Sequence, residues 1–235
     1  MANSWFQFQK FRVEQDRCAM KISTDAILLG ALAKAENPQK ILDVGTGTGV
    51  IALMLAQRFP KSTIQAVEMD PAAASQAKGN FEISDFASRM RIWNGRIQEF
   101  TSENKFDLIV SNPPYFSDHL KSPDVQRNLA LHNDGLSFED LVKKVTEILN
   151  SEGKFWVILP PRQMRDLEKI AYYYGLFPSE KFTIQDNPSK PVIREVISFE
   201  FPRKEISPVA LLIKDDSGAF HESYRKLISG FLLNY

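Results

Sequence analysis

Residues 111 to 116 read SNPPYF and follow a short apolar run, Phe106-Asp107-Leu108-Ile109-Val110. A run of this kind, rich in β-branched residues, is typical of a buried strand. Two consecutive prolines remove two backbone donors and fix φ twice, and they also force Asn112 away from helical conformation. The pattern therefore predicts an amide and an aromatic ring on a stiff backbone at the end of a strand.

The tetrad Asn112-Pro113-Pro114-Tyr115 suits methyl transfer to an exocyclic or amide nitrogen, which is a poor nucleophile because its lone pair is delocalised. The Asn112 side-chain oxygen and the Pro113 carbonyl can each accept one N–H of an NH₂ group, which favours a tetrahedral nitrogen whose lone pair points at the methyl group. Tyr115 offers a flat face for stacking a planar base, and its π-cloud suits a nearby sulfonium cation. We therefore predict that all four residues are catalytic and that Tyr115 also contacts the acceptor.

A second group of residues lies in LDVGTGTG, where Gly45, Gly47 and Gly49 lead from an apolar run into a helix-like segment. Such glycines let the backbone approach a ligand closely, and the start of a helix presents free N–H groups. The alternative is a tight turn without a ligand. The spacing G-x-G-x-G differs from the dinucleotide fingerprint, which disfavours a dehydrogenase, and no Walker lysine follows, which disfavours phosphate transfer.

Two acidic residues accompany these glycines. Glu68 ends the next apolar run, roughly twenty residues further on, where a carboxylate can accept both hydroxyls of a ribose; the alternative is a solvated carboxylate at a strand end. Asp43 ends the first run, and burying it without a partner would be unfavourable, so we expect it to be exposed to a cationic or hydrogen-bonding group of a cofactor. The combination predicts a nucleoside-containing cofactor at the carboxyl ends of the first two strands.

Short apolar runs alternate with helical patterns in the middle of the chain, which predicts an α/β fold with a parallel sheet and helices on both faces. The predicted strands are 40–44, 62–70, 90–94, 105–112 and 153–160, and the predicted helices are 49–59, 71–84 and 137–150. Beyond them, 181–186 and 193–201 suggest a hairpin-like pair at one edge, and 220–235 suggests a terminal helix. We expect residues 1–37 to form an N-terminal extension packed on the sheet and 38–235 to form the main domain.

The composition is that of an ordinary globular protein, with 235 residues, 43% hydrophobic and 25% charged. Lys plus Arg equals Asp plus Glu at 29 each, which argues against a non-specific nucleic-acid coat protein. Cys18 is the only cysteine, which excludes an intrachain disulfide and a cysteine-based zinc cluster. The sequence shows no signal-peptide pattern and no apolar run of about eighteen residues. We therefore expect a cytoplasmic monomer without a metal.

The motifs VGTGTG, AVEMD and SNPPY together resemble those of Rossmann-like S-adenosylmethionine-dependent amino-methyltransferases. The stretch FRVEQDRCAMKISTDAILLGALA resembles the opening of the bacterial tRNA1(Val) adenine-N6-methyltransferase family, and the resemblance continues to the ending AFHESYRKLISGFLLNY. It implies a class I methyltransferase fold with a mostly parallel seven-stranded sheet. It also implies S-adenosylmethionine as cofactor and, as acceptor, the adenine just 3′ of the anticodon in the anticodon stem-loop of a tRNA.

The same resemblance assigns residues to the cofactor site. Thr24 and Asp25, in STDAILLG, match the segment that closes over the cofactor's methionine end. The full predicted cofactor set is Thr24, Asp25, Asp43, Gly45, Gly47, Gly49, Glu68, Ile97 and Asn112. One position departs from the family, because Arg96 stands where such enzymes usually carry an aspartate that accepts a bond from the adenine amine. An arginine cannot accept that bond, so we expect Ile97, the backbone or a polar group such as Asn94 to hold the adenine.

The polar segment Phe116–Gly135 separates the tetrad from the next predicted helix. Connections of this length in a compact domain are commonly functional, so we expect it to close over substrate. Arg127 and His132 in this segment correspond to basic positions of the family. Their functional interpretation is contact with a phosphate or a base of the substrate, and the alternative is that they are solvated loop charges. The aromatic residues of WFQFQKFRV, interleaved with basic ones, suit an RNA loop, although alternating aromatics in a strand are more often core.

Other acceptors are compatible with the tetrad, which also serves methylation of guanine N2 in ribosomal RNA and of a protein glutamine. The N-terminal stretch favours tRNA. A non-catalytic RNA-binding or assembly protein could keep the cofactor pocket, but it would have no need of the rigid amide. A DNA methyltransferase is disfavoured because the sequence shows no obvious separate target-recognition domain.

Overall fold

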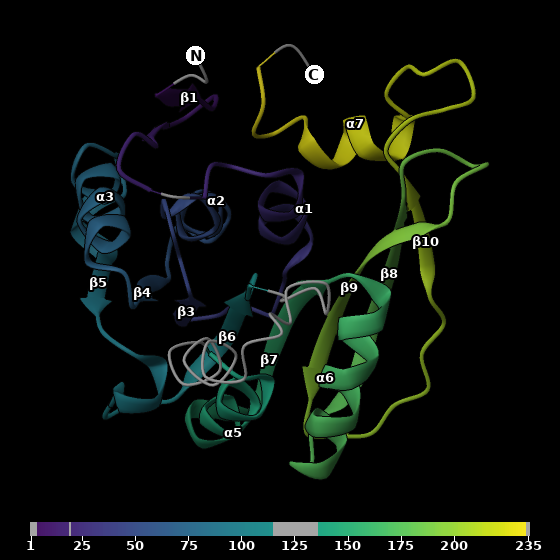
Figure 1. Ribbon diagram of the computed structural model, residues 1–235. Coiled ribbons are helices and arrows are strands. Elements are labelled where there is room, and N and C mark those ends of the chain that lie inside the picture. Colours follow the sequence, from purple (N-terminus) through teal and green to yellow (C-terminus); the bar gives the residue numbers. More distant parts are fainter. Residues whose placement is uncertain (1–3, 19, 115–135, 234–235) are drawn as a thin grey trace, which may run out of the picture.

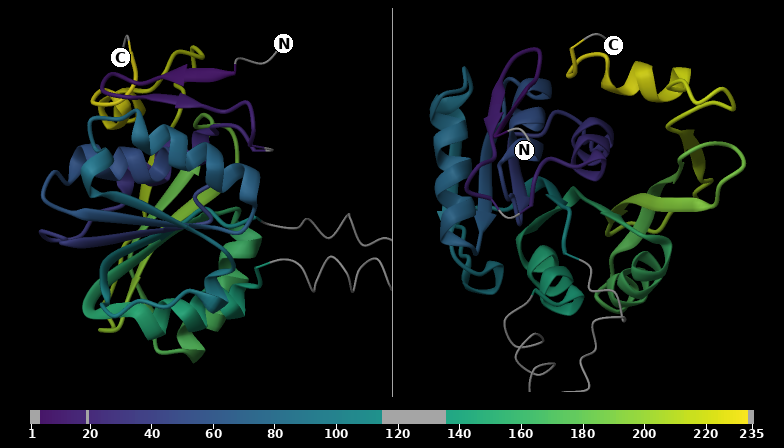
Figure 2. Two further views of the ribbon diagram at one scale, coloured as in Figure 1. Left: turned by 90° about the vertical axis from the view of Figure 1, so that its left-hand side faces the viewer. Right: turned by 45° about the horizontal axis from the view of Figure 1, so that its top comes forward.

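The computed structural model describes residues 4–18, 20–114 and 136–233, and its centre is one mixed sheet with helices on both faces (Figures 1 and 2). Eight strands lie in the order β10-β8-β9-β7-β6-β3-β4-β5. Their bounds are β3 Lys40–Val44, β4 Thr63–Glu68, β5 Met90–Asn94, β6 Phe106–Ser111, β7 Leu149–Leu159, β8 Phe177–Gln185, β9 Val192–Glu200 and β10 Val209–Leu212. This arrangement confirms the predicted α/β fold class.

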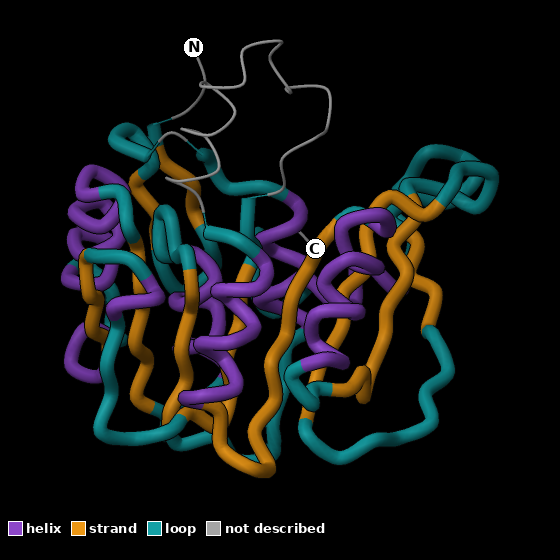
Figure 3. The backbone as a smooth tube through the Cα atoms, turned by 60° about the horizontal axis from the view of Figure 1, so that its bottom comes forward, coloured by secondary structure: helices purple, strands orange, loops and turns teal. Residues whose placement is uncertain are grey.

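Strands β3 to β7 pair in parallel. Figure 3 shows the strands of the sheet in orange, side by side. The α-helices are α1 Thr24–Leu32, α2 Val50–Arg58, α3 Pro71–Glu82, α5 Phe138–Ile148, α6 Pro161–Tyr173 and α7 Glu222–Ile228, and the 3₁₀-helices are η1 Ala87–Arg89 and η2 Ile97–Glu99. Because the carboxyl ends of parallel strands meet at one edge of a sheet, the residues that follow β3, β4 and β6 lie close together.

Successive side chains of each strand point to opposite faces of the sheet, so the core is divided into two layers. Ile41 and Trp156 belong to the cluster packed under α1, α2 and α3, whereas Leu42 and Phe155 belong to the cluster packed against α5 and α6. Trp156 is fully buried and its Nε1–H donates to the Lys34 carbonyl at 2.8 Å, so this large side chain satisfies its polar group inside the core. Both faces of the sheet are therefore covered, as expected for parallel strands.

The far end of the sheet differs from the prediction in two elements. The expected pair of longer strands is confirmed as β8 and β9, with β9 antiparallel to both β7 and β8. The short strand β10, Val209–Leu212, then pairs in parallel with β8, so the sheet has eight strands where seven were predicted. Helix α6 was also not predicted, although Pro161 lies at its start and Met164, Leu167 and Ala171 give it a buried face.

The N-terminal aromatic run forms a separate two-stranded sheet, with β1 Trp5–Gln7 antiparallel to β2 Arg12–Glu14. Phe8 and Phe11 are buried in the core, while Trp5 and Phe6 are exposed. The predicted strand character is thus confirmed, and half of the aromatic side chains serve packing. Among the described residues, no helix has the length and apolar character needed to cross a membrane.

Candidate active site

The glycine turn connects β3 to α2 and is held against the neighbouring strand, since the N–H groups of Gly45 and Thr46 donate to the Val67 carbonyl at 2.9 and 3.1 Å. Gly45, Gly47 and Gly49 have φ values of 72°, 55° and 83°. These left-handed conformations favour glycine. At Gly49 a side chain would also meet the Phe81 ring, because an added Cβ lies 2.5 Å from its Cε1. The sequence G-x-G-x-G is therefore required by the backbone path of the turn.

Glu68 ends β4 beside this turn, and only 8% of it is exposed. Its Oε2 accepts a hydrogen bond from the Gly47 N–H at 2.8 Å, and its Oε1 accepts one from the Asp70 N–H at 3.0 Å. The predicted alternative of a solvated carboxylate is therefore wrong. A carboxylate has about four acceptor sites, so two backbone bonds fix its orientation and leave acceptor capacity for a ligand.

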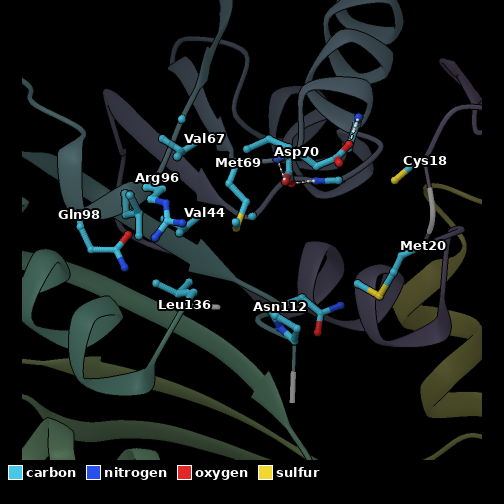
Figure 4. A pocket seen from close by; sticks show the side chains of 17 residues that line it. Cys18, Met20, Val44, Val67, Met69, Asp70, Arg96, Gln98, Asn112 and Leu136 are labelled. Atoms are coloured by element: carbon cyan, nitrogen blue, oxygen red, sulfur yellow. Dashed lines mark hydrogen bonds between the residues drawn. The ribbon is translucent and has the colours of Figure 1, made fainter. Parts of the chain in front are cut away.

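A first cavity of about 360 Å³ opens beside Glu68 (Figure 4). Its walls include the predicted cofactor residues Gly45, Gly47, Glu68, Ile97 and Asn112. Figure 4 shows Cys18 and Met20 on one side of this cavity and Arg96 and Gln98 on the other. Most of the lining is apolar, and the carboxylates of Glu68 and Asp70 lie at one wall, an arrangement that fits a nucleoside with its hydroxyls toward the acids.

Asp43 does not take the position predicted for it, because it is fully buried and lines neither this cavity nor the second cavity defined below. Its Oδ2 accepts hydrogen bonds from Thr46 Oγ1 at 2.6 Å and from the Ala52 N–H at 3.1 Å. Burial raises the pKa of Asp43 from 3.8 to about 7. The predicted exposure to a cofactor group is therefore wrong, and Asp43 instead shapes the glycine turn from inside.

The wall opposite Cys18 and Met20 contains a polar residue that no sequence motif marks (Figure 4). Gln98 lines the first cavity, and its Nε2–H donates to Asp140 Oδ2 at 3.2 Å, which orients the amide. Asn94, considered as an adenine contact, instead donates to the carbonyls of Glu68 and Met69, and it does not line the cavity. Ile97, which was predicted to contact the adenine, is buried and lines the cavity. Gln98 therefore offers an amide at the same wall of the cavity as Arg96.

The described part of the tetrad, Asn112 to Pro114, follows β6 at the same edge of the sheet. Ser111 anchors it, since Ser111 Oγ–H donates to the Val44 carbonyl at 2.9 Å. Asn112 and Pro114 line both the first cavity and a second cavity of about 430 Å³. The amide is thus at the place where the two cavities share lining residues, so it can face the middle of a ligand that extends through both.

The second cavity contains the N-terminal residues predicted to cover the cofactor, Thr24 and Asp25, at the start of α1. Asp25 Oδ2 forms a 2.7 Å ion pair with Nε of Arg194, a residue of β9 that also lines the cavity. The sequence analysis did not identify Arg194. Tyr115, Arg127 and His132 lie outside the described residues. In the part of the chain that the structure describes, no group of three or more His, Cys, Asp or Glu residues could hold a metal ion.

Comparison with known proteins identifies the family of this chain. Residues 21–170 match the family model of the methyltransferase small domain. The chain is 42% identical over 236 residues to the tRNA1(Val) (adenine(37)-N6)-methyltransferase of Bacteroides fragilis, covering 99% of each chain. It is 39% identical over 230 residues to the protein of the same name from Pseudoalteromonas translucida, covering 98% of this chain and 99% of that one.

Solved structures agree on the fold. A predicted O-methyltransferase from Agrobacterium tumefaciens superposes with a TM-score of 0.66 at 20% identity, covering 88% of this chain and 96% of that one. TYW2 from Pyrococcus horikoshii, in complex with MeSAdo, superposes with a TM-score of 0.57 at 17% identity, covering 81% of this chain and 68% of that one. The sequence relationships are much closer, and they extend over nearly the full length of both chains. This chain therefore belongs to the family of tRNA1(Val) (adenine(37)-N6)-methyltransferases.

Proposed function

We propose that this protein transfers the methyl group of S-adenosylmethionine to the N6 amine of an adenine in tRNA, and that its target is the adenine just 3′ of the anticodon of tRNA1(Val). The observation that carries the proposal is the position of Asn112 at the junction of the two cavities. The names of the full-length relatives support the choice of acceptor.

The residues of the first cavity fit the nucleoside part of S-adenosylmethionine. The Glu68 carboxylate, oriented by the N–H groups of Gly47 and Asp70, can accept both ribose hydroxyls. The left-handed Gly45 and Gly47 bring the backbone of the turn to the cavity wall without side chains, whereas Gly49 lies outside the lining of both cavities. Ile97 packs against the base from the apolar side, and Gln98 supplies polar contact at its rim.

The bound cofactor supplies an electrophilic methyl group on a sulfonium sulfur. Asn112 Oδ1 and the Pro113 carbonyl each accept one N–H of the adenine amine, and these bonds are strongest when the nitrogen has become tetrahedral. The prolines hold both acceptors in place, so little reorganisation is needed as the bond to carbon forms. The methylated nitrogen then loses one proton to solvent. An anticodon-loop adenine is already unpaired, which lowers the free-energy cost of moving it into the site.

The experiment combines purified protein and S-adenosylmethionine with an unmodified transcript of the valine tRNA, followed by digestion and mass spectrometry of the nucleosides. We expect N6-methyladenosine. A transcript with guanosine in place of the adenine next to the anticodon is the matched control and should remain unmethylated. The Asn112→Ala variant should methylate the first transcript about 10²- to 10³-fold more slowly and leave the control unmethylated.

Three other results would contradict the proposal. Methylation of the guanosine control would place the target elsewhere in the tRNA. Cofactor binding without a methylated nucleoside, but with methylation of ribosomal RNA or of a protein glutamine, would replace the acceptor. Cofactor binding without transfer to any of these acceptors would support a binding protein that keeps the pocket.

A further inference from the structure

Arg194 is the charged residue of the second cavity that no sequence motif marks. It belongs to β9, yet its Nε lies 2.7 Å from Oδ2 of Asp25, a residue 169 positions earlier in the first turn of α1. Its Nη1 also donates to the Ile193 carbonyl at 2.7 Å. Only 24% of the Arg194 side chain and 17% of the Asp25 side chain are exposed. The guanidinium is therefore held in one orientation at the cavity wall.

The two cavities differ in chemical character although they are connected. They share Gly45, Gly47, Asn112 and Pro114, so one ligand can extend from the first into the second. The first is mostly apolar, with acidic groups at one wall. The second contains the cations of Lys21 and Arg194 together with the anion of Asp25, and its lining includes Val50 and Ile51 of α2. A ligand that fills both should therefore carry a nucleoside at one end and a zwitterion at the other.

We propose that Arg194, oriented by Asp25, binds the α-carboxylate of the cofactor's methionine end, with the Asp25 carboxylate facing its α-ammonium group. This inference rests on the proposed function and adds a ligand for the cofactor to it. A guanidinium has five N–H donors in a planar fork, so it can bond a carboxylate in addition to Asp25 and Ile193.

The other anion near such a site is a phosphate of the tRNA. The lining of the second cavity favours the cofactor, since Gly45, Gly47, Asn112 and Pro114 are shared with the first cavity, where the nucleoside fits. A cofactor bound in the first cavity therefore extends toward Arg194, and the experiment below distinguishes the two anions.

The test compares two ligands by calorimetry, in the full-length protein. S-adenosylhomocysteine carries the amino-acid end, and 5′-methylthioadenosine lacks it. In the Arg194→Gln variant we expect affinity for S-adenosylhomocysteine to fall roughly 10- to 100-fold, while affinity for 5′-methylthioadenosine changes less than about twofold. The Arg194→Lys variant keeps the charge but loses the planar fork, and its loss should be intermediate.

A matched control is Glu68→Gln, which should lower the affinity for both ligands by the same factor because both ligands carry the ribose. Partial unfolding of Arg194→Gln would lower the binding stoichiometry and leave the ratio of the two affinities unchanged, so the ratio tests the contact itself. Equal losses for both ligands in Arg194→Gln would overturn the inference. Unchanged affinity for both, with a raised KM for tRNA, would assign Arg194 to the acceptor instead. Failure of the wild-type protein to bind S-adenosylhomocysteine would contradict the proposed function itself.

Discussion

The Glu68 carboxylate and the Gly47 N–H are joined by a 2.8 Å hydrogen bond across 21 residues of chain. The bond links the end of β4 to the glycine turn after β3. The second oxygen of Glu68 is bound by the Asp70 N–H at 3.0 Å, so both oxygens are oriented by the backbone. The two motifs VGTGTG and AVEMD are therefore joined into one structure by hydrogen bonds between side chain and backbone.

We expect Glu68→Gln to weaken binding of S-adenosylhomocysteine roughly 10- to 100-fold, because hydrogen bonds to a charged group contribute about 1.5–3 kcal/mol. The amide nitrogen would also oppose one of the two backbone N–H donors. Calorimetry measures the change. Glu82→Gln, at the exposed end of α3, is the matched control and should bind like the wild type. Unchanged affinity in Glu68→Gln would exclude the ribose contact.

Asn112→Ala separates catalysis from cofactor binding. We expect the transfer rate to fall about 10²- to 10³-fold, the range for loss of one polar group that stabilises a transition state. Because Asn112 shares the first cavity's wall with many other residues, affinity for S-adenosylhomocysteine should change less than about threefold. Single-turnover kinetics measures the transfer rate, and calorimetry on the same sample measures the affinity for S-adenosylhomocysteine. An equal loss in both would assign Asn112 to cofactor binding alone.

The sequence allowed prediction of those elements whose signals are local. The run Lys40–Val44 is confirmed as β3, and Met90–Asn94 is confirmed as β5. Helix α3 begins at Pro71 as predicted, because proline suits a first helical turn. The strand β10 was missed since four residues with two exposed side chains carry almost no periodic pattern.

The site was predictable where its residues follow strands directly, and not where tertiary packing brings them in. Glu68 and Asn112 end parallel strands, so their meeting follows from the topology. Arg194 comes from a strand inserted antiparallel between β7 and β8, and no pattern in the sequence pairs it with Asp25. Asp43 was placed wrongly because its partners, the Thr46 hydroxyl and the Ala52 N–H, become available only once the turn has folded.

Gln98 offers a test of adenine recognition. Its Nε2–H donates to Asp140, which leaves its amide oxygen as the acceptor for the adenine amine. Wild-type protein should therefore bind S-adenosylhomocysteine more tightly than S-inosylhomocysteine, which has a carbonyl in place of that amine. In Gln98→Leu we expect this preference to shrink by roughly 3- to 10-fold, the effect of one hydrogen bond. An unchanged preference would assign adenine selectivity to the backbone.

We expect alanine substitutions at two glycines of the turn to lower the free energy of unfolding by different amounts. Gly45 and Gly49 both have positive φ, at 72° and 83°, but an added Cβ meets nothing within 4 Å at Gly45 and lies 2.5 Å from the Phe81 ring at Gly49. Gly45→Ala should therefore reduce the free energy of unfolding by about 1–2 kcal/mol, the cost of the left-handed conformation. Gly49→Ala should lose about 1–3 kcal/mol more from the steric clash. Urea unfolding compares them, and equal losses would contradict the packing of Phe81 on the turn.

The buried carboxyl of Asp43 predicts a pH-dependent stability. Burial raises its pKa from 3.8 to about 7, an effect that the bonds from Thr46 and Ala52 only partly offset. Between about pH 4 and pH 7 the native state therefore keeps a proton that the unfolded chain has released, so this residue's contribution to stability falls as the pH rises and is constant above that window.

Asp43→Asn removes this titration and keeps an oxygen that can accept the same two hydrogen bonds. The variant should match the wild type near pH 4 and exceed its free energy of unfolding at pH 8 by an amount on the order of 2–4 kcal/mol. Urea unfolding at a series of pH values measures the difference between the two proteins, which cancels the titration of all other groups. The control Asp216→Asn changes an exposed carboxylate and should show no such difference. If the difference for Asp43→Asn is the same at pH 4 and pH 8, Asp43 is ionised in the native state throughout this range.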